Sequence, residues 1–265
     1  MFKKVTSIIL AFVMVFASFA GCSNPKEEGN GKLNVVCTIF PQYDFIRAIA
    51  GDKVNLKMIV TPDTEYSSYK PSKRDLKVMK NADLFVYVGY NFDKWAKEVI
   101  EGNENENFNY VSLVDICDHV LTIDEEGIFE SSLLNFIDSY SVIDSNVWAS
   151  ISNSMVMVSN LSAWLCNLDP ANEEFYKENA RNYMEELASV DLQYKTLSNN
   201  VSNEVIDVKN PLNYIFSDYN IIPIQVTELQ KLGINTMEKV SKSDFENGVT
   251  YLDIVKSNFE KFKNV

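Results

Sequence analysis

The stretch TPDTEYSSYKPS, residues 61–72, has the composition of a functional loop, with a proline near each end. It places an acid, Glu65, and two tyrosines, Tyr66 and Tyr69, around Ser67. None of these side chains is a strong ligand for a transition metal or an activated nucleophile. The loop therefore has the frame of a binding site without an obvious chemical centre.

The sequence carries no recognisable catalytic motif. It lacks G-x-S-x-G, a P-loop and G-x-G-x-x-G. The single histidine, His119, has no partner in a known nucleophile–base arrangement, and we interpret it as a loop or surface residue. The 37 acidic residues make chance pairs of carboxylates common, so such pairs carry little weight. We predict a protein that is not an enzyme.

The N-terminus predicts export and lipidation. Two lysines precede an apolar run at residues 5–20, which is shorter than the ~20 residues that span a bilayer. Small residues then precede Cys22, as in a lipoprotein signal. We expect residues 1–21 to be a signal peptide, Cys22 to carry the lipid, and 22–32 to form a flexible tether. The alternative is ordinary cleavage that leaves a free cysteine.

The net charge and the cysteine content argue against nucleic-acid binding and against a disulfide framework. The formal charge is −13, and removal of Lys3 and Lys4 with the signal peptide changes it to −15. Such an acidic chain lacks the basic excess that nucleic-acid binding requires. The remaining cysteines, Cys37, Cys117 and Cys166, lie far apart among apolar residues, which favours buried thiols over disulfides or a metal cluster.

Apolar runs of strand length alternate with helical periodicity through the first half of the chain. The expected strands are 33–38, 53–60, 83–89 and 109–114, and the expected helices are 43–50, 73–82 and 92–100. This alternation predicts a parallel sheet covered by helices. Ligands of such sheets bind beyond the carboxyl ends of the strands, where residues 61–72 fall.

The second half predicts a long helix and a smaller lobe. An acidic, irregular segment at 118–145 comes first, and the expected elements that follow are a helix at 147–165, the longest helix from Asp169-Pro170, strands at 203–208 and 221–226, and helices at 211–219 and 250–263. We predict an α/β fold of two βα lobes with parallel sheets, joined by a rigid connecting helix. The expected boundaries are 33–165, 166–198 and 199–265, with the last lobe abbreviated.

Several motifs in order resemble one family. They are LNVVCTIFPQYDFIRAIAGDKVNLKMIV, NADLFVYVGYNFDKW, DPANEEFYKENARNYMEEL with DLQY, and TYLDIVKSNFEKF. Together they resemble the cluster 9, zinc/manganese-type substrate-binding lipoproteins of ABC importers over most of 33–226 and again over 248–263. The resemblance implies a monomer on the extracytoplasmic face of a bacterial cell membrane, working with an ABC permease.

The resemblance also implies three histidines and a carboxylate that hold the metal in a cleft. The family's motif P-G-x-E-P-H-x-Y-E-P places Ser67 at the first histidine, and D-P-H-V-W places Asn146 at the second. The motif H-x-A-F-x-Y…Y-G-L places Lys209 at the third. No residue matches the carboxylate, because several dozen residues are missing between Val226 and Gly248, and the fold of 227–247 stays open.

The replaced side chains are poor metal ligands. A serine hydroxyl and an asparagine carbonyl are neutral and weak for zinc, and a lysine ammonium has no lone pair to offer. We therefore expect a degenerate or altered metal site, although zinc or manganese is the family's cargo, and we assign no cofactor.

Four alternatives for the cleft remain open. In the first, the Lys209 ammonium takes the place of the metal's charge and pairs with Glu65 or Asp144. In the second, Ser67, Asn146 and Lys209 together hold an anion or a polar solute. A third alternative is an inactive copy that binds nothing. A fourth is a hard cation displaced to the acidic segment 118–145.

The tyrosines that flank Ser67, Tyr66 and Tyr69, are candidates to line the cleft. We predict a solute-binding lipoprotein of a metal-type importer. The alternative is a surface lipoprotein that uses the same scaffold for adhesion or partner binding.

Overall fold

The computed structural model describes residues 31–62, 64–124, 127–131, 142–197 and 210–264. The predicted signal peptide, the predicted lipidation site at Cys22, nearly all of the predicted tether and Lys209 lie outside these residues. Residues from Leu33 onward form one compact unit. Within the described part of the chain, no helix is both long and apolar enough to span a membrane.

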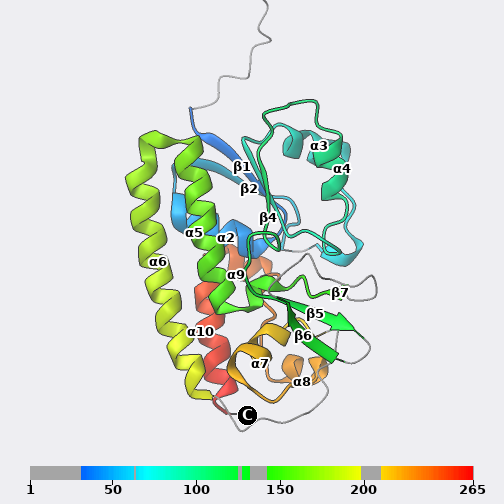
Figure 1. Ribbon diagram of the computed structural model, residues 1–265, viewed down its shortest axis with the longest axis vertical. Coiled ribbons are helices and arrows are strands. Elements are labelled where there is room, and N and C mark those ends of the chain that lie inside the picture. The colour runs from blue at the N-terminus through cyan, green and yellow to red at the C-terminus, as the bar shows by residue number, and fades with distance from the viewer. Residues whose placement is uncertain (1–30, 63, 125–126, 132–141, 198–209, 265) are drawn as a thin grey trace, which may run out of the picture. The chain divides into compact units, whose positions relative to one another are not determined.

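A four-stranded sheet forms the first half of this unit (Figure 1). Its strands are β1 (Leu33–Cys37), β2 (Val54–Met58), β3 (Leu84–Tyr87) and β4 (Tyr110–Ser112), in the order β2-β1-β3-β4. All three pairings are parallel, which confirms the predicted sheet. The central strands are continuous apolar runs because both of their faces are buried.

Helices connect the strands as predicted. They are α2 (Phe40–Ala50), α3 (Lys73–Lys80) and α4 (Ala96–Glu101), with a 3-10 turn, η2, at Tyr66–Ser68. The start of α3 is encoded locally, since the side chains of Ser72 and Asp75 form a reciprocal capping box. The helix expected from residue 92 begins only at Ala96, because Asp93 binds backbone amides of the preceding loop.

Two long helices, α5 (Ile151–Leu168) and α6 (Glu173–Tyr194), pack side by side (Figure 1). Short 3-10 turns precede them, η4 (Val147–Ala149) and η5 (Pro170–Asn172), and η6 (Lys195–Leu197) follows α6. The helix expected from Asp169-Pro170 opens as the turn η5, and α6 itself starts only at Glu173, with Asn172 as its N-cap. Asp169 is the N-cap residue of η5. However, its carboxylate accepts from Asn172 Nδ2 at 2.7 Å and from the Tyr176 hydroxyl at 2.6 Å, instead of capping the backbone.

Part of the segment predicted to be irregular is a second sheet. Strands β5 (Val120–Asp124), β6 (Gly127–Ser131) and β7 (Val142–Ile143) pair antiparallel in the order β6-β5-β7. The prediction of an irregular segment was wrong for these residues. The acidic composition of the segment obscured a short β-prone run, and the strands that pair with this run can be identified only in the folded structure. The buried start of this run packs on α7, where the Leu121 amide donates to the Tyr214 hydroxyl at 3.0 Å.

The end of the described chain is helical. It contains α7 (Asn213–Tyr219), α8 (Val226–Lys231), α9 (Lys242–Glu246) and α10 (Tyr251–Phe262). The strand expected at 221–226 is wrong, since residues 221–225 have no regular structure and α8 starts at Val226. The strand expected at 203–208 lies outside the described residues. The predicted C-terminal helix is confirmed, with a capping box from Thr250 and Asp253 at its start.

Helix α10 is built into the core of the first half. The buried Asp44 carboxylate accepts from the Tyr251 amide at 2.8 Å, and the Tyr251 hydroxyl donates to the Trp148 carbonyl at 2.6 Å. Phe45 meets Tyr251 edge-on at 4.9 Å between ring centroids. These contacts fix the C-terminal segments against the sheet that carries the loop at 61–72.

Candidate functional site

The loop at 61–72 follows β2 and is linked by stacked rings to two other segments. Tyr66, in the same turn as Ser67, stacks on Phe92 at 4.4 Å and 10° between ring planes. Phe92, from the loop after β3, meets Trp148 edge-on at 5.2 Å and 83°. The structure therefore brings together the loop of the first family motif and the segment of the second.

The Asp144 carboxylate accepts hydrogen bonds from Asn146 and from a second asparagine, Asn213. The buried Asp144 carboxylate accepts at Oδ1 from the Asn146 amide at 2.9 Å and from Asn146 Nδ2 at 2.8 Å. Its Oδ2 accepts from Asn213 Nδ2 at 3.1 Å. Burial raises the pKa of Asp144, and these hydrogen bonds oppose the rise. The side chain of Asn146, which the family motif is predicted to place at the second histidine, thus donates to a neighbouring carboxylate.

A lysine does stand beside Glu65, but it is Lys239. Its Nζ lies 3.0 Å from Glu65 Oε2, with both side chains about half exposed. The neighbouring Glu238 is partly buried, and this burial raises the pKa of its carboxyl group. The positive charge of Lys239 lowers the pKa of Glu238, and the negative charge of Glu65 raises it. Both residues belong to 227–247, which matched no family motif, so no sequence signal pointed to them.

Tyr66 lies where carboxylates from three segments approach. Burial raises the pKa of Tyr66 to about 12, and the charges of Glu238, Glu65 and Asp144 contribute in that order. Its hydroxyl is therefore protonated at neutral pH and can act as a donor. Tyr69 has a different environment, since its ring packs edge-on against Trp95 at 5.6 Å.

The cleft is nearly closed in this conformation. A pocket lies between the ends of β1 and β2, the segment Glu238–Val240 and four residues of the loop, Thr61, Pro62, Thr64 and Tyr66. It leaves only ≈ 10 Å³ for the centres of water molecules, about the space of one water. The loop and the C-terminal segment touch instead of leaving room for a solute.

The metal-ligating residue types are sparse or occupied. The chain has one histidine, and the described residues contain no group of three or more His, Cys, Asp or Glu side chains that fits a metal ion. His119 lies in a loop, as predicted, with Nε2 at 3.0 Å from Asp218 Oδ1. Asp218 also accepts from the Ser150 hydroxyl at 2.6 Å.

The three described cysteines form no disulfide. Cys37 and Cys117 are buried, as predicted, and burial raises the pKa of both thiols. Cys166 is only partly buried and lies within 3.7 Å of the Glu173 carbonyl oxygen. Thiols with raised pKa are protonated at neutral pH and are poor metal ligands.

The Lys239–Glu65 pair should contribute little to stability. Because both side chains are about half exposed, Lys239→Ala should lower the free energy of unfolding by less than about 1 kcal/mol, and less still at high salt. Urea unfolding at low and high salt measures this, with Lys231→Ala, which removes an exposed pair with Glu228, as the control. A loss above about 2 kcal/mol would contradict the surface character of the pair.

Comparisons with known proteins agree on one family. The family model described as "ZnuA: Zinc-uptake complex component A periplasmic" matches residues 35–254. The metal ABC transporter substrate-binding lipoprotein ScbA of Streptococcus cristatus is 29% identical over 248 residues, covering 89% of this chain and 74% of ScbA. The high-affinity zinc uptake system protein ZnuA of Bacillus subtilis is 23% identical over 316 residues, covering 100% and 98%.

Solved structures share the fold. The Zn(II)-bound ZnuA-like domain of Streptococcus pneumoniae AdcA superposes with a TM-score of 0.69 at 20% identity, covering 88% of this chain and 98% of that one. The metal-dependent lipoprotein YcdH of Bacillus subtilis gives 0.70 at 22%, covering 88% and 98%. These relatives confirm the α/β fold and the expectation of a binding protein that is not an enzyme. The chain belongs to the ZnuA family of periplasmic zinc-uptake components.

Proposed function

We propose that the chain is the extracytoplasmic solute-binding lipoprotein of an ABC importer of the zinc and manganese type, with a cleft in which a lysine of the protein replaces the metal. The observation that carries this proposal is the Lys239 ammonium, 3.0 Å from Glu65 in the loop of the first ligand motif. Lys239 also lines the cleft pocket, whose remaining space is about that of one water.

The histidine count supports the loss of the family's ligand set. A site of three histidines needs more histidines than this chain has, and its only one is bound to Asp218. At the second ligand position, the Asn146 amide is directed to Asp144. The proposal thus modifies the Lys209 hypothesis: a lysine fills the charge position beside Glu65, and it comes from the segment before α9.

The cellular setting follows from the family and the N-terminus. ScbA and related proteins are named as substrate-binding lipoproteins of metal ABC transporters. We extend that setting to this chain, with Cys22 as the lipid anchor, a membrane permease and its ATPase as partners, and a monomer as the working form. With Lys239 in the cleft, the protein would either dock to the permease without a metal cargo or carry a different solute.

Thermal unfolding of metal-stripped residues 23–265 tests the proposal. We expect no shift with Zn²⁺ or Mn²⁺ at about 100 µM, whereas a binder with micromolar Kd would gain about 2.7 kcal/mol, or several degrees. A shift that Asn146→Ala abolishes would overturn the proposal. A shift indifferent to Asn146→Ala would overturn it too and would direct attention to the acidic residues of 118–145, part of which lies outside the described residues.

A further inference from the structure

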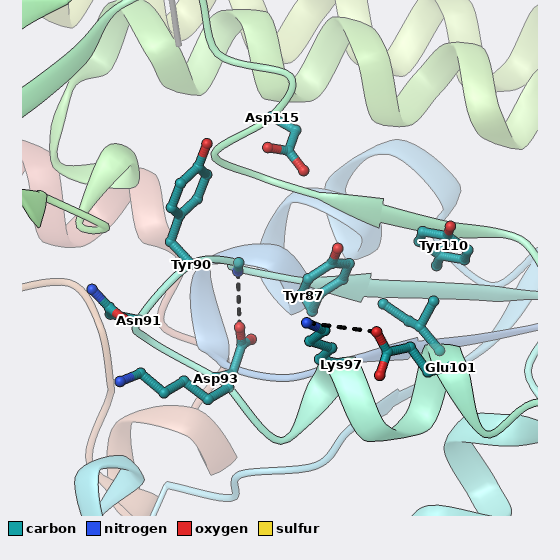
Figure 2. Close-up of a pocket in the computed structure, with 11 residues that line it drawn as sticks. Tyr87, Tyr90, Asn91, Asp93, Lys97, Glu101, Tyr110 and Asp115 are labelled. Atoms are coloured by element: carbon teal, nitrogen blue, oxygen red, sulfur yellow. Dashed lines mark hydrogen bonds and ion pairs between the residues drawn. The ribbon is translucent and has the colours of Figure 1, made fainter. Parts of the chain in front are cut away.

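A second pocket, larger than the cleft pocket, lies outside the cleft. It has a volume of ≈ 700 Å³ and is bounded by the end of β3, the strand β4 and helix α4 (Figure 2). No residue lines both this pocket and the cleft pocket. Its size falls within the range of about 300–1,000 Å³ that is typical of small-molecule sites.

Three tyrosines form the aromatic walls of this pocket: Tyr87, Tyr90 and Tyr110. The rings of Tyr87 and Tyr110 lie 6.5 Å apart between centroids, tilted by 51°. Tyr90 is 45% exposed and Tyr110 is 44% exposed, which makes them two of the five large exposed hydrophobic side chains of the described residues. Aromatic side chains that line a hollow are typical of pockets that bind small molecules.

A carboxylate stands at one side of the aromatic walls. Figure 2 shows Asp115 on the side toward which the Tyr90 ring extends, with Tyr87 between Asp115 and the pair of Lys97 and Glu101. Among the described residues, no cation forms an ion pair with Asp115, and its charge adds to burial in raising the pKa of Tyr90. Lys97 is paired with Glu101 at 3.6 Å.

The loop that carries Tyr90 is rigidly built. Tyr90 has a φ of +49°, a conformation that costs a tyrosine energy and persists only where neighbours enforce it. Gly89 before it has a φ of +102°, and a Cβ there would lie 2.3 Å from Ser112 Oγ. The buried Asp93 holds the amides of Val88 and Gly89, each at 2.8 Å. The pocket is therefore formed before any ligand binds.

We propose that this pocket binds a small quaternary ammonium compound, with its cation against the tyrosine faces and Asp115. A quaternary ammonium has no N–H to donate, so it is recognised by aromatic faces within about 6 Å and by a nearby negative charge. The lining has three carboxylates, those of Asp93, Glu101 and Asp115, against the two lysines Lys94 and Lys97. Lys97 is paired with Glu101, and the excess of carboxylates favours a cation over an anion. The site is independent of the metal question in the cleft.

Calorimetric titration of residues 23–265 with choline, in the presence of a chelator, tests the site. The matched probe is 3,3-dimethylbutan-1-ol, which has the same shape with a neutral carbon in place of the nitrogen. We expect choline to bind at least about tenfold more tightly than the neutral probe, because only a cation interacts with the ring quadrupoles and Asp115. Equal affinity for the two probes would overturn the proposal.

Variants identify the residues responsible. Tyr90→Ala and Tyr110→Ala should each weaken choline binding by about two- to fivefold, and Asp115→Asn by about tenfold. The control Asp118→Asn makes the same charge change at an exposed position three residues away that does not line the pocket, and should leave affinity unchanged. If Asp115→Asn binds as the wild type does while its thermal unfolding is unaltered, the assignment is wrong.

The same chemistry occurs in a free solute and in a lipid headgroup. Sedimentation with phosphatidylcholine vesicles, against phosphatidylglycerol vesicles, distinguishes the two sources. Binding to phosphatidylcholine that Asp115→Asn abolishes would assign the headgroup, and binding to free choline alone would assign a solute; both support the site. If neither choline nor phosphatidylcholine is bound in an Asp115-dependent manner, the site is refuted.

Discussion

Asp93→Ala should lower the free energy of unfolding by about 3 kcal/mol, the largest loss that we expect from a single polar substitution. The carboxylate is 3% exposed and accepts from the Thr38 hydroxyl at 2.9 Å and from the Val88 and Gly89 amides at 2.8 Å each. Truncation leaves these buried donors without their acceptor. The loop after β3 would then lose the anchor that fixes Tyr90 and Phe92.

Urea unfolding followed by circular dichroism measures this loss. The control Asp118→Ala removes an exposed acid and should change the free energy of unfolding by no more than about 0.5 kcal/mol. A loss below about 1 kcal/mol for Asp93→Ala would show that the donors find other acceptors.

The pH dependence of Asp93 has a defined sign. Burial raises the pKa of Asp93 in the folded protein, so the folded state binds its proton more readily than the unfolded chain does. The energetic cost of the ionised form is present above the folded pKa and is relieved as the pH falls toward the ordinary carboxyl range. Compared with Asp93→Asn, the wild type should therefore gain stability as the pH falls from neutrality.

The triple variant Ser67→His/Asn146→His/Lys209→His should acquire zinc-dependent stability. Imidazole nitrogens bind zinc well, whereas the present hydroxyl, amide and ammonium do not. At a hundredfold excess of zinc over Kd, the expected gain is about 2.7 kcal/mol, which the wild type should lack. Without metal, the variant should be less stable by about 1 kcal/mol, because Asn146→His removes an amide donor from Asp144.

Thermal unfolding with zinc and with chelator measures this gain. The matched control moves one histidine by a single residue, Ser68→His in place of Ser67→His, within the same 3-10 turn. This control should lose most of the zinc response, because metal coordination depends on ligand direction. If the triple variant shows no zinc response, the three positions do not converge on one site. The proposal that the cleft is an altered metal site with ligands at these positions would then be wrong.

Local signals in the sequence determined most of the first half of the fold. Apolar runs gave the four parallel strands, and caps such as Ser72 with Asp75 and Thr250 with Asp253 marked where helices begin. These signals act within a few residues, so they can be read without knowing the rest of the structure. That the chain has a single histidine was also visible in the sequence, because it depends only on residue types.

The tertiary structure decided which distant residues meet. Lys239 reaches Glu65 across 174 positions, and Asn213 reaches Asp144 across 69. The antiparallel sheet of β5, β6 and β7 and the pocket around Tyr87, Tyr90 and Tyr110 likewise depend on pairing between segments. Local composition carries no record of such partners, because they are set by how whole elements pack and by which buried donors find an acceptor.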